Sequence, residues 1–156
     1  MTAHSVEIVP YRPDHAQAWR GLNEYWILAG GYAIEAKDEL VLSDPEGAIL
    51  SKGGAIFIAE LDGRPVGCCS LMQMDDGGHE VGKMAVDAAA QGLRLGERLL
   101  ESCEAQARRS GSSRLYLETN AAQNHAIALY RRFGFVDLPA QPTPYARCNV
   151  WMEKRL

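Results

Sequence analysis

The segment Val86-Asp-Ala-Ala-Ala-Gln91-Gly92-Leu93-Arg94-Leu95-Gly96 joins a predicted strand to a predicted helix. Its glycines let the backbone approach a ligand closely, and the free N–H groups of a first helical turn can hold a phosphate. The segment lacks the Gly-Lys-Ser/Thr of a P-loop and the glycine spacing of a dinucleotide-binding fingerprint. It therefore indicates either an anion site of another kind or a turn whose glycines serve only packing.

The helix that follows is predicted over residues 91–110. One apolar stripe runs along it, formed by Leu95, Leu99, Cys103 and Ala107. Arg94 and Arg98 lie near its start, where the helix dipole disfavours cations. Their position suggests an anionic ligand, unless both side chains simply point into water.

Three strands are predicted before this helix, over residues 55–61, 66–74 and 80–86. The hairpin signal Asp62-Gly63 and a second tight turn separate them, so we expect an antiparallel meander. The strand predicted at 114–118, after the helix, should return parallel to 80–86 by a right-handed crossover.

The remaining elements lie toward the two ends of the chain. A helix is predicted from Asp14, as its N-cap, to Ala29, with Ala18, Leu22 and Trp26 on its inner face. The others are a strand at 6–9, a short helix at 37–43, a helix at 124–133 ended by Gly134, and strands at 135–138 and 148–154. The order β-α-α-β-β-β-α-β-α-β-β predicts an α/β (α+β) fold with helices on the faces of a mixed sheet.

Length and composition narrow the class of protein. The 156 residues have the length of one compact unit without a linker, so 1–156 is expected to be a single domain. A net charge of −4 argues against a general nucleic-acid binder. Without a membrane-length apolar run or a signal-peptide pattern, a soluble, cytoplasmic protein is expected. No metal site is predicted, because zinc-ligand spacing is missing from Cys68, Cys69, Cys103 and Cys148.

The second informative segment is Asn124-His-Ala-Ile-Ala-Leu-Tyr130-Arg-Arg-Phe133-Gly134-Phe135. Taken alone, it predicts a helix with Tyr130 in the core and Gly134 at its C-terminal end. Together with the turn at 91–96, it resembles the GNAT superfamily of acyl-CoA-dependent N-acyltransferases over about residues 80–156. The family turn Gln/Arg-x-x-Gly-x-Gly/Ala reads Gln91-Gly-Leu-Arg94-Leu-Gly96 here, with arginine in place of the middle glycine.

The resemblance implies a mostly antiparallel sheet flanked by helices, with a splayed parallel strand pair at the CoA site. It implies acetyl-CoA as co-substrate, with the pyrophosphate on the turn formed by Gln91, Gly92, Leu93, Arg94, Leu95 and Gly96. The remaining cofactor-binding residues that it implies are Met84, Ala85 and Val86 through their backbone, together with Asn120, Asn124 and Tyr130.

The resemblance also implies that the acetyl group passes directly to a primary amine in a ternary complex. Such an amine is mostly protonated at neutral pH, so a base must take its proton. Glu80 is the predicted base and Tyr130 the residue that assists the departing thiolate. His79 or a water chain remains open as the base, and a covalent route through a cysteine is disfavoured.

The acceptor is expected to lie between the first two helices and the final hairpin. The candidate residues are Trp26, Tyr32, Glu35, Tyr145 and Arg147. Glu35 would suit a cationic acceptor and Arg147 a carboxylate, in a small-molecule or peptide amine, and a homodimer remains open. The alternative function is a catalytically idle acyl-CoA-binding or sensing module, which would need the turn but neither Glu80 nor Tyr130.

Overall fold

The computed structural model describes residues 4–156, and seven strands form one sheet in the order β1-β2-β3-β4-β5-β7-β6. The strands are β1 (Val6–Pro10), β2 (Ala55–Leu61), β3 (Arg64–Gln73), β4 (His79–Val86), β5 (Arg114–Thr119), β6 (Val136–Leu138) and β7 (Val150–Arg155). Every neighbouring pair is antiparallel except β4 and β5, which are parallel. The predicted mixed, mostly antiparallel sheet is confirmed.

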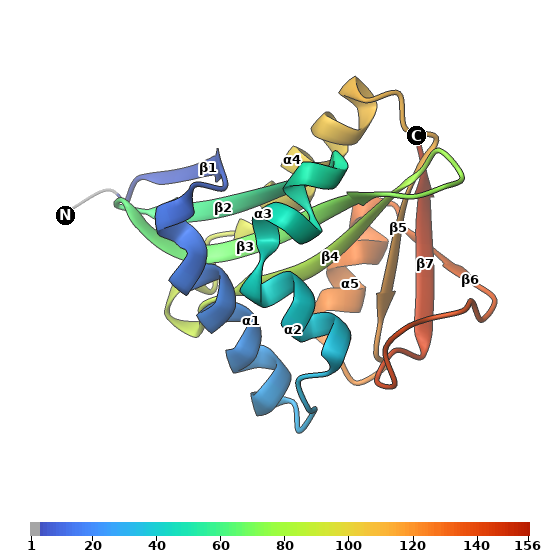
Figure 1. The fold of residues 1–156 in the computed structure, drawn as a ribbon, viewed down its shortest axis with the longest axis horizontal. Coiled ribbons are helices and arrows are strands. Elements are labelled where there is room, and N and C mark those ends of the chain that lie inside the picture. Colours follow the sequence, from blue (N-terminus) through green and yellow to red (C-terminus); the bar gives the residue numbers. More distant parts are fainter. Residues whose placement is uncertain (1–3) are drawn as a thin grey trace.

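Helices cover both faces of this sheet (Figure 1). The helices are α1 (Ala16–Ala29), α2 (Ala36–Ser43), α3 (Pro45–Ala48), α4 (Leu95–Arg109) and α5 (Asn124–Phe133). Trp19 of α1 packs with Cys68 on one face, while Leu99 of α4 packs with Cys69 on the other. Adjacent residues of β3 therefore point to opposite faces. Within residues 4–156, no helix is long and apolar enough to cross a bilayer.

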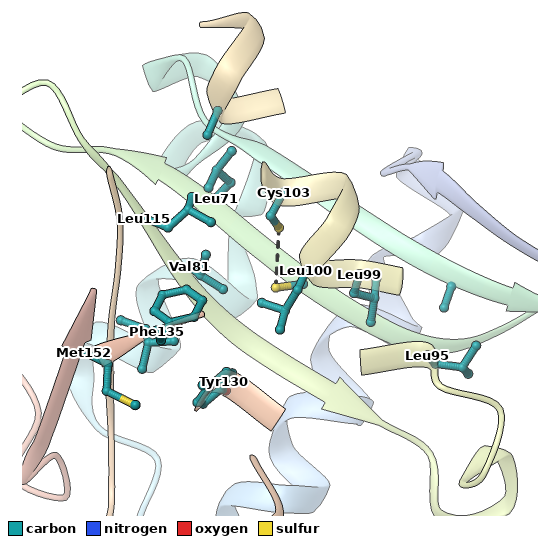
Figure 2. Close-up of a cluster of buried hydrophobic side chains, with 14 of the residues drawn as sticks. Leu71, Val81, Leu95, Leu99, Leu100, Cys103, Leu115, Tyr130, Phe135 and Met152 are labelled. Carbon is teal, nitrogen blue, oxygen red and sulfur yellow. Dashed lines mark hydrogen bonds between the residues drawn. The ribbon is translucent and has the colours of Figure 1, made fainter. Parts of the chain in front are cut away.

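The larger core lies between the sheet and the pair α4 and α5 (Figure 2). The predicted stripe of α4 is buried there, with Leu99, Cys103 and Ala107 fully inaccessible to solvent. Cys103 Sγ lies 3.7 Å from Cys69 Sγ, and the ring of Tyr130 meets Phe135 edge-on at 5.9 Å between centroids. This packing fixes α5, and with it Tyr130, against the sheet.

The predicted inner face of α1 is wrong by one residue. Trp19, Asn23 and Ile27 are completely buried, whereas Ala18, Leu22 and Trp26 are only partly covered. The reason is Asn23, a polar residue that interrupts the apolar pattern. Its amide nitrogen donates to the Trp19 carbonyl at 2.9 Å, and its Oδ1 accepts from Trp26 Nε1 at 3.1 Å. Because these bonds satisfy the amide, the residue can be buried.

Two predicted helix starts are also wrong. Asp14 does not cap α1, which begins at Ala16 after a short 3-10 turn at Pro13–His15. Helix α4 begins at Leu95, because Arg94 has a left-handed backbone with φ of 57° that no helix accommodates. Residues 91–94 therefore form the loop before α4 rather than its first turn.

Candidate active site

Strands β4 and β5 separate after a short stretch of pairing. In the part of the chain that the structure describes, they pair only at His79 with Leu115 and Glu80 with Tyr116, although both strands continue beyond these residues. A cleft of about 1000 Å³ begins at this opening and runs from the start of α4 to α1, α2 and the loop before β7. The predicted splayed parallel pair is confirmed.

The turn before α4 forms one end of the cleft. Five of its predicted residues line the cleft, namely Gln91, Gly92, Arg94, Leu95 and Gly96, while Leu93 packs against the core. The first intrahelical bond joins the Arg98 N–H to the Arg94 carbonyl at 3.1 Å. The N–H groups of Leu95, Gly96 and Glu97 precede it and have no acceptor within the helix. This end can therefore bind an anionic group through backbone donors and the helix dipole.

Arg94 explains why the family turn has glycine at this position. Its φ of 57° and ψ of 34° lie in the left-handed region that glycine adopts without steric cost. The side chain is exposed at the cleft rim, so it does not fill the space beside the backbone donors. The departure from the family pattern therefore strains the backbone without blocking the anion site.

A bulge in β4 lies in the middle of the cleft. Cys68 pairs with Ala85 and Ser70 with Gly82, so two residues of β4, Lys83 and Met84, stand opposite a single residue of β3. Lys83 has a φ of 50°, which marks the centre of the bulge. A bulge interrupts the ladder and leaves backbone groups of β4 free for a ligand. The predicted backbone-binding residues Met84, Ala85 and Val86 all line the cleft at this point.

Asn124, predicted to bind the pantetheine arm, does not line the cleft at the start of α5. Asn120 lines the cleft, and its amide donates to the Arg147 carbonyl at 2.6 Å. Asn124 is exposed and outside the cleft, whereas Gln123, the N-cap residue of α5, lines it. One residue along a helix turns a side chain by about 100°. Ala128, one turn after Asn124, does line the cleft, so Asn124 lies on a helix face that continues into it.

Tyr130, the residue predicted to assist the thiolate, is a cleft residue. It lines the cleft from α5 and is 8% exposed. Burial, with a smaller contribution from Cys69, raises the pKa of the phenol above its usual value. The hydroxyl therefore stays protonated and acts only as a hydrogen-bond donor or acceptor.

Glu80 projects into the same cleft from β4. Burial is the main cause that raises its pKa to about 7, and the nearby charge of Glu118 adds to it, against Lys83 and Lys37, which lower it. A carboxylate with this pKa is half ionised at neutral pH and binds a proton far more strongly than an exposed one. These are the properties of a general base that works near neutrality.

His79, the alternative base, is placed less favourably. It is 5% exposed and does not line the cleft, because successive residues of a strand point to opposite faces. Burial lowers its pKa, and its Nδ1 has no hydrogen-bond partner among residues 4–156. The geometry favours Glu80 over His79.

A buried ion cluster closes the acceptor end of the cleft. Asp38 of α2 is inaccessible to solvent and accepts from Arg147 at 2.6 and 2.8 Å and from Lys83 Nζ at 2.7 Å. Lys83 Nζ also contacts the Tyr145 hydroxyl at 3.1 Å. Burial opposes ionisation of Asp38, but the bonds from Arg147 and Lys83 outweigh it and lower its pKa to about 2. Asp38 is therefore ionised at neutral pH, while burial lowers the pKa of Lys83 against the opposing effect of Asp38.

This cluster changes how the predicted acceptor residues can act. Trp26, Tyr32, Tyr145 and Arg147 line the cleft, and Glu35 does not. Arg147 is bound by Asp38 and lies 3.3 Å from Glu35, with its guanidinium over the rings of Trp26 and Tyr145. Arg147 thus forms ion pairs with Glu35 and Asp38, so neither Glu35 nor Arg147 is an unpaired charge that faces an acceptor. Trp26, Tyr32 and Tyr145 remain candidates for acceptor contacts.

Sequence reasoning missed Asp38, Gln123 and Glu118. Asp38 follows Glu35 by three residues and accepts its N–H at 2.8 Å, which is a capping-box spacing that the sequence displays. Glu118 had no comparable signal, because it reads as one polar residue of an alternating strand. Its place in the cleft depends on the separation of β4 from β5.

The cysteines do not offer a nucleophile. Cys68, Cys69 and Cys103 are completely buried, and all four cysteines are free thiols. Burial raises the pKa of Cys68 to about 12, so the thiolate that attack requires is not formed near neutral pH. Cys148 is partly exposed and lines the cleft, and burial is the main cause that raises its pKa to about 11, so its thiolate is also scarce near neutral pH.

A mixed sheet that opens between parallel strands, with helix N–H donors at one end of the opening, is the arrangement that the resemblance to GNAT acyltransferases implies. The model of the Acetyltransferase (GNAT) family matches residues 15–135. The chain belongs to this family.

Two relatives and two solved structures illustrate the similarity. The IAA acetyltransferase of Azospirillum brasilense is 41% identical over 105 residues, which cover 64% of this chain and 67% of that protein. The uncharacterized N-acetyltransferase YjgM of Escherichia coli K12 is 34% identical over 143 residues, or 85% of this chain and 81% of its own length.

Both solved structures cover 97% of this chain and 99% of their own. A GNAT acetyltransferase from Staphylococcus aureus Mu50 superposes with a TM-score of 0.87 at 20% identity. The PaiA N-acetyltransferase of Thermoplasma acidophilum, solved in complex with coenzyme A, gives 0.80 at 18% identity. At these identities the two structures show the fold.

Proposed function

We propose that this single-domain protein, residues 1–156, transfers an acetyl group from acetyl-CoA to a primary amine in a ternary complex. The observation that carries the proposal is Glu80, a half-buried carboxylate with a pKa of about 7 inside the cleft of an acetyltransferase fold. The names of the relatives, an acetyltransferase and an N-acetyltransferase, support it. The coenzyme A in the Thermoplasma structure supports the choice of donor.

Acetyl-CoA would bind at the end of the cleft beside α4 and along its middle. The N–H groups of Leu95, Gly96 and Glu97 would hold the pyrophosphate. The backbone of β4 at the bulge, around Met84, would bind the pantetheine arm as an added strand, because the bulge frees groups from the β3 ladder. The same groups would polarise the thioester carbonyl.

The chemistry follows from two side chains. The amine nitrogen attacks the thioester carbon, the new C–N bond forms, and the C–S bond breaks to release CoA thiolate. Glu80 takes the proton that the amine loses, directly or through water, and returns it to solvent. Tyr130 donates a hydrogen bond to the departing sulfur, a role open to it because its raised pKa keeps the phenol protonated. The products are the N-acetylated amine and CoA.

The test is a panel of primary amines incubated with acetyl-CoA, with release of the CoA thiol as the readout. We expect turnover with at least one alkylamine and a thermal shift with acetyl-CoA alone. An idle acyl-CoA-binding module would give the shift without turnover. A protein that merely binds phosphate would respond equally to ADP and CoA, and that result would contradict the proposed donor.

A further inference from the structure

Glu118 lies across the opened strand pair from Glu80. Glu80 and Tyr116 are paired positions of β4 and β5, so their side chains leave the same face of the sheet. Glu118 follows Tyr116 by two residues and shares that face. Both carboxylates line the cleft. The acceptor half of the cleft therefore contains a pair of acids.

Glu118 is held by neutral hydroxyl groups rather than by a cation. The Tyr116 hydroxyl donates to Oε2 and Thr143 Oγ1 donates to Oε1, both at 2.8 Å. The neighbouring Arg114 is bound to Asp76 at 2.7 Å and to Glu153 at 2.9 Å. Glu118 thus accepts two hydrogen bonds from hydroxyl groups and has no ion pair among residues 4–156.

The other charged and titratable groups around Glu80 and Glu118 form no ion pair with either acid among residues 4–156. Lys37 of α2 faces the cleft, and Lys83 and Arg147 are both bound to Asp38. The remaining titratable groups, Tyr116, Tyr145 and Cys148, stay neutral because burial first, and the nearby carboxylates second, raise their pKa values. Two cations act on Glu80, and of these Lys83 is bound to Asp38 whereas Lys37 has no ion pair among residues 4–156.

We propose that Glu118 is the second carboxylate of the acceptor site, which positions the acceptor as an alkylammonium ion and makes Glu80 the group that takes its proton. Two nearby acids disfavour each other's ionisation. Among residues 4–156, Glu118 accepts two hydrogen bonds that hold its carboxylate in place, whereas Glu80 has no hydrogen-bond partner and stays open to a substrate or to water. The inference rests on the proposed function and names its substrate class, an alkylamine without an adjacent carboxylate.

The first test is a titration that needs no turnover. Carboxyl carbons of glutamate are followed by NMR in protein labelled with ¹³C-glutamate, and Glu80→Gln identifies the signal of Glu80. Glu118→Gln should move the titration midpoint of Glu80 to lower pH by about one pH unit. Glu7→Gln is the matched control, because Glu7 is an exposed carboxylate on β1 outside the cleft, and it should leave the midpoint unchanged. An unchanged midpoint in Glu118→Gln would overturn the inference.

A second variant covers the case in which Glu118→Gln does not fold. Thr143→Val removes one donor from Glu118 and keeps both carboxylates. With an amine that the wild-type protein acetylates, KM for that amine should then rise, because Glu118 loses one of the two contacts that hold it in place. A KM that stays at the wild-type value would show that the hydroxyl groups do not position Glu118, and would also overturn the inference.

The second test uses an amine that the wild-type protein acetylates. Glu118→Gln should raise KM for that alkylamine about tenfold and shift the acidic limb of kcat/KM to lower pH, and Glu118→Asp should restore part of both. If the wild-type protein acetylates no amine, the proposed function fails. If it does, and Glu118→Gln changes neither KM nor the limb, only the role of Glu118 is wrong.

Discussion

Arg94→Gly should stabilise the protein and weaken its affinity for acetyl-CoA at the same time. The stabilisation comes from the backbone, because a left-handed φ of 57° costs an arginine about 1–2 kcal/mol that glycine avoids. Glycine also makes the unfolded chain more flexible, which offsets about 0.4–1 kcal/mol of this gain. The net increase in the free energy of unfolding is about 0.5–1 kcal/mol, or roughly 1–4 °C in Tm for a chain of this length.

The loss of affinity comes from the side chain. Arg94 is exposed at the end of the cleft that offers backbone donors to an anion, so its charge can reach a phosphate of the CoA. An exposed ion pair contributes up to about 1 kcal/mol, which corresponds to a loss of affinity of up to about fivefold. Since salt screens such a contact, the difference between variant and wild type should shrink as ionic strength rises.

Calorimetric titration with acetyl-CoA and thermal unfolding measure the two effects separately. Arg94→Gln is the matched control, because it removes the charge and keeps the left-handed backbone. It should lose affinity as Arg94→Gly does, without the gain in Tm. A Tm that does not rise in Arg94→Gly would refute the strain argument, and an unchanged affinity in both variants would show that Arg94 is only solvated.

Three further substitutions test the site. Asp38→Asn should unfold at lower temperature at pH 7, because Arg147 and Lys83 lose a buried counter-charge, a change that costs about 3–5 kcal/mol for a broken buried pair. Since the pKa of Asp38 is lowered from 3.8 to about 2, its contribution to the free energy of unfolding is present above pH 4 and is lost as pH falls toward 2. The stabilities of variant and wild type should therefore converge near pH 2. Tyr130→Phe should lower kcat and leave the circular dichroism melting curve nearly unchanged; an unaltered kcat would remove Tyr130 from the reaction. Cys68→Ala should retain kcat within about twofold, since a thiol with its pKa raised to about 12 is not a nucleophile; complete loss of turnover in a folded variant would revive a covalent route.

Local patterns predicted most of the fold because they are determined by neighbouring residues. Asp62-Gly63 has positive φ at both positions, 51° and 81°, which is the geometry that the hairpin signal encodes. The stripe of α4 and the terminal Gly134 of α5, with φ of 109°, are equally local. The inner face of α1 failed because the buried Asn23 is polar, and its satisfaction by Trp19 and Trp26 is visible only in the folded chain.

The site also has a part that local sequence predicts and a part that depends on tertiary packing. The positions of the turn before α4 and of Glu80 at the cleft could be predicted, since each lies in a motif or directly before one. The acceptor end could not, because Asp38, Lys83 and Arg147 come from three distant segments and meet only through tertiary packing. Sequence reasoning could read Glu35 and Arg147 as charges but could not show that they face each other.

The pH dependence of acetyl transfer by Glu80→Gln tests the central claim most directly. With an accepted amine, the wild-type protein should show an acidic limb in kcat/KM near pH 7, where Glu80 titrates. Glu80→Gln should lower kcat by about 10²–10⁴-fold, remove that limb and bind acetyl-CoA with nearly unchanged affinity. A variant that keeps the full rate and the same pH profile would contradict the assignment of Glu80 as the base.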